Sequence, residues 1–155
     1  MLVELDNGVI WMLIRAKNGI GQSYSDDNGI TWSEGEDSGL GGPCSRFCIR
    51  RLKSGNLILI NHHNFTGRNN LKAMISEDDG KTWKGYFLID NRGQVSYPDM
   101  TADNGGNIYI VYDRERTSER EILMAIITEA DILAGKLVNK NSRLRIIANK
   151  AFGVL

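Results

Sequence analysis

One eight-residue pattern occurs twice in this sequence and constrains the fold more than any other feature. Residues 25–32 read SDDNGITW and residues 76–83 read SEDDGKTW, so both copies follow Ser-x-Asp-x-Gly-x-Thr-Trp without a gap. The two copies begin 51 residues apart. About four strands of five or six residues, together with their turns, need this length. The repeat therefore predicts successive four-stranded antiparallel sheets, as in the blades of a β-propeller.

The conserved positions of the pattern have roles in folding. The aspartate in the middle, Asp27 or Asp78, can accept hydrogen bonds from the backbone amides of its own turn. The glycine, Gly29 or Gly80, supplies the positive φ at which the chain reverses. The threonine and tryptophan are expected to open the next strand, where the indole fills space beside the neighbouring sheet. The two aspartates are therefore predicted to be structural and not catalytic.

Glycines punctuate the remaining sequence into short apolar runs, which favours antiparallel β structure. Tight hairpins are expected where residues that tolerate a left-handed backbone cluster, at positions 6–8, 54–56 and 104–106. Only Thr128 to Ala134 is predicted to be helical, with Gly135 as its C-cap. The predicted strands cover residues 9–14, 47–52, 57–61, 71–75, 108–112 and 122–128.

The predicted fold class is all-β, a partial β-propeller with one short helix near the C-terminus. The 155 residues are interpreted as a single domain of about three blades, at approximately 1–40, 44–90 and 95–150. The inner half of the first blade is expected to combine Val9 to Arg15 with residues preceding Met1. Three blades would leave two apolar sheet faces exposed. We therefore expect that the chain is part of a longer protein, or that a second copy completes a six-bladed ring.

Composition narrows the possible partners. Lysine plus arginine and aspartate plus glutamate both total 19, so the net charge is zero and neither a nucleic-acid nor an anionic-membrane partner is predicted. A mean hydropathy of −0.30 and the lack of a long apolar run predict no membrane-spanning helix. The first residues show no signal peptide, and the compartment is left open.

The cysteine and histidine residues predict neither a metal site nor a cofactor. Cys44 and Cys48 are four positions apart, a spacing typical of neither a zinc site nor a disulfide, and are interpreted as ordinary strand residues. His62 and His63 are adjacent, so on a strand their side chains point to opposite faces and cannot share one metal ion.

The repeated octapeptide is the Asp box, or BNR repeat, and the stretches around it make the chain resemble the C-terminal half of a six-bladed sialidase (neuraminidase). Residues 3–8 read VELDNG, and Arg15 ends the following strand. This stretch is similar to the V-E-L-x-D-G segment of sialidases, which leads to the second arginine of their carboxylate-binding triad. In that family the catalytic glutamate lies about five residues before the V-E-L glutamate, here Glu4, which would place it before Met1.

Two further stretches carry the same resemblance. Residues 64–70 read NFTGRNN, and Arg68 lies twelve positions before Gly80 of the second Asp box. The third triad arginine of sialidases has this offset. Residues 95–99 read VSYPD and resemble the S-Y-S segment that bears the nucleophilic tyrosine of the family, with Pro98 in place of a small residue. The resemblance therefore implies that Tyr97 is the nucleophile.

The chemistry of such a site explains these residue types. Sialic acid carries a carboxylate on its anomeric carbon, and a planar guanidinium offers it two donors. A carboxylate nucleophile would be repelled there, which suits a tyrosine activated by a glutamate base. The resemblance implies that Arg15 and Arg68 bind the substrate. Arg46, which heads the innermost strand of a blade, is a further substrate-binding candidate, although a structural role is favoured. Asp99 and Glu4 rank below it.

Each of these residues also has an ordinary structural interpretation. Arg15 would extend its stem along the sheet and its head into solvent, Arg68 would be a surface residue of a polar loop, and Tyr97 would be a core aromatic. Tyr86, Tyr109 and Tyr112 are expected to be such core residues. Residues 113–121 alternate in charge and are predicted to form a solvated hairpin with local ion pairs.

The leading hypothesis is a sialidase-like glycoside hydrolase fragment that acts on a terminal acidic sugar and is inactive alone. Two alternatives stay open. The chain could be a non-catalytic Asp-box propeller that binds glycan or protein through the same mouth. It could also belong to a propeller enzyme, hydrolase or lyase, that acts on another acidic sugar, because arginines recognise a carboxylate whatever ring carries it.

Overall fold

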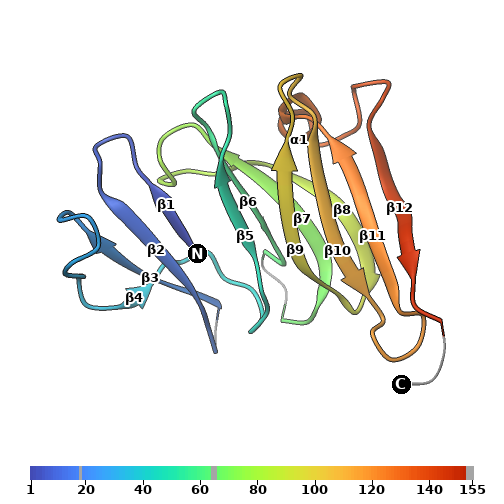
Figure 1. The fold of residues 1–155 in the computed structure, drawn as a ribbon, viewed down its shortest axis with the longest axis horizontal. Helices are drawn as coiled ribbons and strands as arrows, with labels where there is room; N and C mark the ends of the chain where they lie inside the picture. The colour runs from blue at the N-terminus through green and yellow to red at the C-terminus, as the bar shows by residue number, and fades with distance from the viewer. Residues whose placement is uncertain (18, 64–65, 153–155) are drawn as a thin grey trace.

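The computed structural model describes residues 1–17, 19–63 and 66–152, which form three four-stranded antiparallel sheets and one short helix. In each sheet the strands lie in chain order, and the three sheets follow one another along the molecule (Figure 1). The predicted all-β class with a short helix near the C-terminus is confirmed. The first sheet contains β1 (Leu2–Glu4), β2 (Ile10–Ala16), β3 (Gly19–Ser25) and β4 (Glu36–Asp37). The second contains β5 (Cys48–Arg51), β6 (Leu57–Asn61), β7 (Asn69–Ser76) and β8 (Lys84–Gly93). The third contains β9 (Val95–Ala102), β10 (Ile108–Arg114), β11 (Glu121–Ile127) and β12 (Arg143–Lys150), with α1 (Glu129–Ala134) between its last two strands.

The middle sheet is buried on both faces. Strand β6 is an unbroken buried run because its side chains alternate between two hydrophobic clusters. Leu57 and Leu59 face the first sheet, in one cluster with Trp11 of β2. Ile58 and Ile60 pack toward the third sheet. The core is therefore two layers, one on each side of the second sheet.

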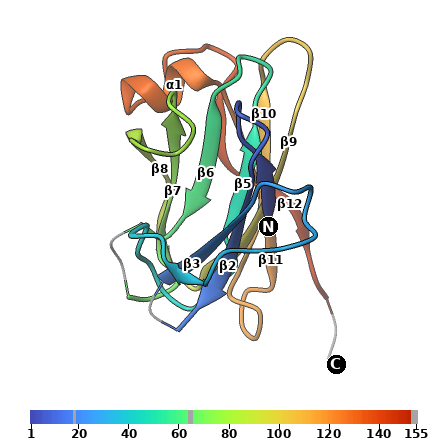
Figure 2. The same ribbon diagram turned by 90° about the vertical axis from the view of Figure 1, so that its left-hand side faces the viewer.

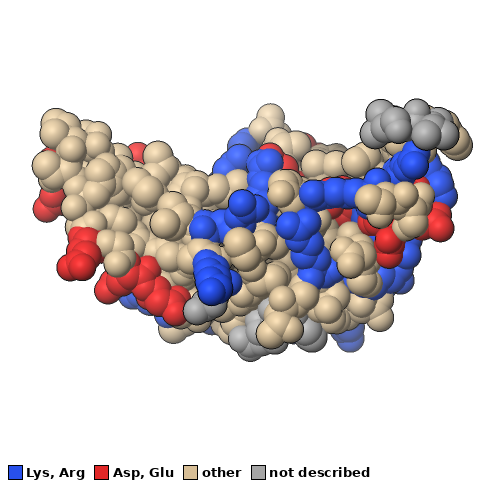
Figure 3. All heavy atoms as spheres, turned by 90° about the horizontal axis from the view of Figure 1, so that it is seen from below, with Lys and Arg blue, Asp and Glu red and all other residues tan. Residues whose placement is uncertain are grey.

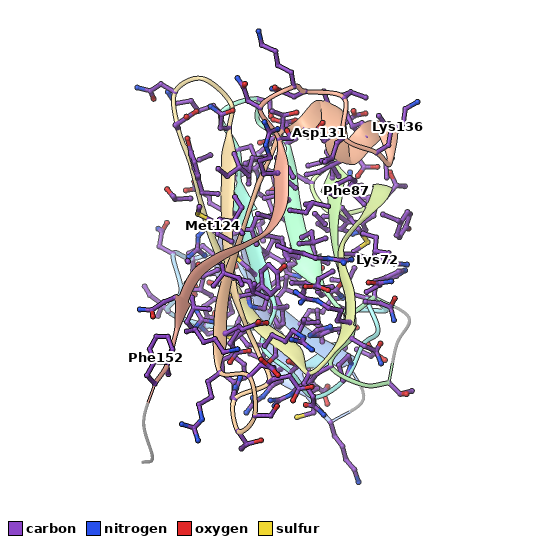
Figure 4. The ribbon with its side chains drawn as sticks, turned by 90° about the vertical axis from the view of Figure 1, so that its right-hand side faces the viewer. Lys72, Phe87, Met124, Asp131, Lys136 and Phe152 are labelled. Carbon is purple, nitrogen blue, oxygen red and sulfur yellow. The ribbon has the colours of Figure 1, made fainter. Side chains whose placement is uncertain are left out.

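The outward faces of the first and third sheets carry exposed apolar side chains. Ile14 alternates with the buried Leu13 on β2, and Val111 alternates with buried neighbours on β10. Ile122, on β11, is also exposed. Met124 lies on the same strand and is labelled in Figure 4. No described helix is long and apolar enough to cross a membrane.

The Asp-box turns have the predicted local chemistry. The Asp27 carboxylate accepts hydrogen bonds from the backbone N of Thr31 at 2.8 Å and from its hydroxyl at 2.6 Å. Asp78 does the same with Thr82, at 2.8 Å from its backbone N. These bonds lower the pKa of each aspartate to about 2. Both carboxylates are engaged within their own turns, which is a folding role.

Of the two Asp-box tryptophans, Trp83 fits the expectation that they open the next strand beside a neighbouring sheet, and Trp32 does not. Trp83 directly precedes β8 and packs partly buried against the cluster between the first two sheets. Trp32 lies four residues before β4 and donates from its indole to the Gly29 carbonyl at 3.1 Å. The indole of the first box therefore bonds within its own turn.

The helix begins and ends where its sequence predicts. Thr128 is the N-cap and forms a capping box with Asp131, and Gly135 ends the helix with φ 64°. Asp131 is fully buried, which by itself would raise its pKa, but hydrogen bonds from Ser142 and from two backbone amides lower it to about 2. The helix lies at one end of the molecule (Figure 2). Phe152 lies toward the opposite end in Figure 4.

In the first sheet, β1 pairs with β2 from Leu2 to Glu4, opposite Ile10 to Met12. Two expectations about the fold were wrong. Cys44 lies in a loop and is exposed, so only Cys48 is a strand cysteine. Tyr86 is exposed, with a positive φ of 45°, whereas Tyr112 is buried as expected.

Candidate functional site

Tyr97 projects from a β-bulge near the start of β9. Ser96 pairs with Asp113 and Asp99 pairs with Val111, so Tyr97 and Pro98 together lie opposite a single residue of β10. The φ of Tyr97 is 55°, a left-handed value that is uncommon for a residue other than glycine. Bulges of this kind redirect a side chain and are frequent beside functional sites.

Two guanidinium groups lie close to the Tyr97 ring. The Cζ atom of Arg116 lies 3.9 Å from the ring centroid, and that of Arg68 lies 5.4 Å from it. Both distances are within the range of a cation–π contact. Hydrogen bonding by Arg116 and then by Arg15 lowers the pKa of the Tyr97 phenol below its ordinary value. The tyrosine thus lies among three arginines.

An open cavity of about 600 Å³ lies beside Tyr97. Its polar wall consists of Tyr97, Arg15 and Arg46, and its apolar wall includes Leu13 and Phe47. Pockets that hold small ligands have this size and this mixture of apolar surface with a few polar groups. The cavity therefore combines two arginines, a phenol and an apolar wall.

Arg46 is held by an acidic neighbour. Its Nη2 atom lies 2.9 Å from Oδ2 of Asp99, and Nη2 of Arg50 lies 3.5 Å from Oδ1 of the same carboxylate. Asp99, a lower-ranked site candidate from the sequence, therefore orients two arginines. Both members of the Arg46–Asp99 pair are partly exposed. Arg46 lines the cavity and has a structural partner at the same time.

Arg116 also belongs to this cluster, although it was not among the site residues expected from the sequence. It lies in the 113–121 segment, which was expected to be a solvated hairpin with local ion pairs. It does pair with Asp113, but it also stacks on Tyr97. A signal was present in the sequence order: Arg15 lies near the end of the second strand of its sheet, and Arg68 and Arg116 each lie between the second and third strands of theirs. These connections lie at the same end of the molecule (Figure 1).

The face at this end is rich in positive charge. Figure 3 shows lysine and arginine side chains gathered in a band across its middle, with acidic side chains mainly toward the two sides. A second, smaller hollow of about 310 Å³ is lined by Arg68, Arg116, Gln94, Ser96, Glu115 and Thr117. The chain has no net charge, so this concentration is a product of the fold.

The four predicted site residues Arg15, Arg46, Arg68 and Tyr97 are thus brought to one end of the molecule, and their roles stay predictions. Glu4 is not among them. It pairs with Ile10, five positions before Arg15 on β2, and its carbonyl accepts a 2.7 Å hydrogen bond from Arg51. Asn64 and Phe65 of the arginine-bearing stretch lie outside the described residues.

The two histidines have structural contacts. His62 is buried, with Nδ1 2.8 Å from the Asn69 carbonyl, and Nδ1 of His63 lies 3.1 Å from the Leu40 carbonyl. Across the described ranges, no three histidine, cysteine or acidic residues are grouped so that they could hold a metal ion.

Comparison with known proteins defines the family. The structure is similar to the crystal structure of a protein of unknown function from Dyadobacter fermentans DSM 18053, with a TM-score of 0.57 and 15% sequence identity. The alignment covers 83% of this chain and 46% of that one, so the chain spans less than half of the similar protein. This likeness concerns the fold alone. The comparison with curated proteins gives no match. The BNR repeat-like domain matches residues 1–110, and the chain therefore belongs to this sialidase-type repeat family.

Proposed function

We propose that the chain forms part of a sialidase-like site that binds a terminal acidic sugar, with Arg15 and Arg68 on the carboxylate and Tyr97 as the nucleophile. One observation carries the proposal: Tyr97 lies among three guanidinium groups at the wall of a ligand-sized cavity. A buried or surface tyrosine with a purely structural role has no need of such an environment. Arg46 is positioned to line the same cavity beside Asp99.

The chemistry suits a sugar that carries its carboxylate on the reacting carbon. The arginines attract the carboxylate and offer paired donors. The Tyr97 oxygen would attack the anomeric carbon while the bond to the leaving alcohol breaks, giving a glycosyl–tyrosine that water then hydrolyses. The neighbouring arginines raise the phenolate fraction of Tyr97, because they lower the pKa of the phenol.

A general base for the phenol proton and an acid for the leaving group are also needed. The interactions that shift the pKa of Tyr97 come from arginines. We therefore propose that the acid and the base belong to other parts of a complete site, and that the chain alone binds the sugar without hydrolysing it.

We further propose that additional sheets complete a six-bladed propeller. The successive sheets, the exposed apolar residues on the two outer faces, and a similar solved chain of which this alignment covers 46% support this arrangement. A propeller blade is normally packed between two neighbours. The remaining blades would come from a longer protein or from a second copy of the chain.

Binding to N-acetylneuraminic acid, followed by NMR, tests the proposal. We expect binding of the free acid and much weaker binding of its methyl ester, which lacks the negative charge. Arg15→Ala and Arg68→Ala should each weaken binding by roughly tenfold to a hundredfold, the range for a hydrogen bond to a charged group. Arg143→Ala, at the start of β12, serves as the matched control. Equal affinity for acid and ester would overturn the proposal.

The second candidate function is non-catalytic glycan binding, which the all-arginine surroundings of Tyr97 favour. The two functions separate in a complete protein that contains this chain. A fluorogenic sialoside should be hydrolysed if the site is catalytic, and Tyr97→Phe should abolish hydrolysis while leaving binding of the free sugar. Glucuronic acid, tested in parallel, distinguishes a preference for another acidic sugar.

A further inference from the structure

Arg116 is itself held rigidly. Its Nε atom donates to Asp113, and its Nη2 atom donates to the Ser96 hydroxyl at 2.9 Å. The Ser96 hydroxyl in turn donates to Asp113 at 2.6 Å. Ser96 and Asp113 are directly paired residues of β9 and β10, so they have a fixed separation. The planar guanidinium is therefore anchored at two of its edges to the framework of the third sheet.

The Tyr97 ring lies on this anchored cation. The Cζ atom of Arg116 is 3.9 Å from the ring centroid, which is closer than that of Arg68 at 5.4 Å. Tyr97 also follows Ser96 directly in the chain, and Ser96 is one of the two residues that bind Arg116. The pairing of β9 with β10 around Ser96 and Asp113 therefore fixes the position of Arg116. The same pairing contains the bulge that gives Tyr97 its φ of 55°.

We propose that Arg116 is a positioning residue for Tyr97: anchored by Asp113 and Ser96, it holds the phenol in the orientation needed at the sugar site. This inference rests on the proposed function for the identity of the ligand. The contact between the two residues, however, can be measured without any sugar. Arg116 also adds positive charge beside the phenol, and it lines the smaller hollow together with Arg68.

The charged groups around Tyr97 come from several elements. Arg15 comes from β2, Arg68 precedes β7, and Arg116 follows β10.

The cavity is also lined by Arg46, which Asp99 neutralises in part, and by Met1, whose ammonium donates to the Leu13 carbonyl. Asp113 lies behind Arg116 and is bonded to it. Glu115 lines the smaller hollow. Within the described part of the chain, the positive charges are therefore the ones next to the phenol.

Titration of the individual tyrosines tests the inference. The chain is labelled with ¹³C at the tyrosine Cζ, and Tyr97→Phe identifies the Tyr97 resonance among the five tyrosines. Tyr97 should titrate at a lower pH than Tyr109 and Tyr112, whose pKa values are raised, Tyr109 by its bond to Asp103 and Tyr112 by burial. Arg116→Gln should raise the pKa of Tyr97. Arg143→Gln, with the same loss of charge far from the tyrosine, should not.

A second pair of measurements separates positioning from charge alone. Arg116→Lys keeps the charge but not the planar fork, so Tyr97 should titrate between its positions in the parent chain and in Arg116→Gln. Affinity for N-acetylneuraminic acid should fall by about tenfold in Arg116→Gln, as expected for the loss of one cation–π contact and its orienting effect. The Tyr112 resonance reports that each variant is folded, because Tyr112 is buried between the second and third sheets.

The outcomes distinguish the two proposals. An unchanged Tyr97 titration in folded Arg116→Gln would overturn the positioning role, even if the parent chain binds the sugar. A shifted titration in a chain that binds no acidic sugar would support the positioning role and overturn the proposed function. If Arg116→Gln does not fold, Arg116→Lys decides: a titration curve identical with that of the parent chain would contradict the need for the anchored fork.

Discussion

Gly80 of the second Asp box lies directly against the Trp11 ring of the first sheet. A Cβ atom at Gly80 would be 2.5 Å from the nearest ring atom, and Gly80 has φ 85°. The glycine therefore meets two requirements, a left-handed turn and close contact between adjacent sheets. Gly29 of the first box has the same φ, 86°, but its Cβ would have 3.6 Å to the nearest atom.

This difference predicts unequal costs for the same substitution. Gly80→Ala should lower the free energy of unfolding by about 2–4 kcal/mol, because backbone strain adds to overpacking against Trp11. Gly29→Ala should cost only about 1 kcal/mol, from the backbone alone. Urea unfolding followed by tryptophan fluorescence measures both. Equal losses would contradict the role of the inter-sheet contact.

The Asp-box carboxylates predict how stability depends on pH. The folded-state pKa of Asp78 is lowered to about 2, so its stabilisation is present above the ordinary value of 3.8 and is lost as the pH falls through about 2. Asp78→Asn should lower the urea midpoint at pH 7, and the difference from the parent chain should shrink toward pH 2. Exposed Asp26→Asn, beside the aspartate of the other box, is the control. A constant difference across this pH range would contradict the prediction.

The N-cap of the helix predicts a smaller loss of stability than the glycine of the second Asp box. Thr128 accepts a hydrogen bond from the backbone N of Asp131 at 3.3 Å, and its hydroxyl donates to the Asp131 carboxylate at 2.8 Å. Thr128→Ala should therefore reduce the free energy of unfolding by about 1 kcal/mol. Thr128→Ser retains the hydroxyl oxygen and should cost clearly less. Chemical denaturation of the three proteins makes the comparison, and an alanine variant as stable as the serine variant would be inconsistent with a capping role.

The outer face of the third sheet bears on how a ring could be completed. Val111 and Ile122 are both 41% exposed there. If a second copy of the chain completes the ring, light scattering should show concentration-dependent dimers. The double variant Val111→Lys with Ile122→Lys should then remain monomeric, because two charges would have to be buried in the contact. A parent chain that stays monomeric at all concentrations would rule out the two-copy ring.

The local features of the fold were predictable because their determinants are close in sequence. The Asp27 carboxylate accepts from residues three and four positions later, and the capping box spans Thr128 to Asp131. Such contacts form in any context that permits the turn or the helix. The limits of β4 were not predictable in this way, since this two-residue strand exists only through pairing with β3.

The candidate site was predictable in part. Its arginines at positions 15 and 68, and Tyr97, follow from sequence offsets to motifs, and the structure brings them to one end. Arg116 carries no motif. Its contact with Tyr97 depends on the register of β9 with β10 and on the bulge between Val111 and Asp113, which no pattern in the sequence reveals.

The sequence by itself determined the repeated sheet, its Asp-box turns, the helix and its caps, because each rests on backbone conformation and hydrogen bonds between near neighbours. Only the tertiary structure decided which charges meet. Arg46 forms an ion pair with Asp99, 53 positions away, and Arg116 stacks on Tyr97 of the adjacent strand. The side-chain composition is electrically neutral, and it is the alignment of strand ends from three sheets that gathers the guanidinium groups around Tyr97.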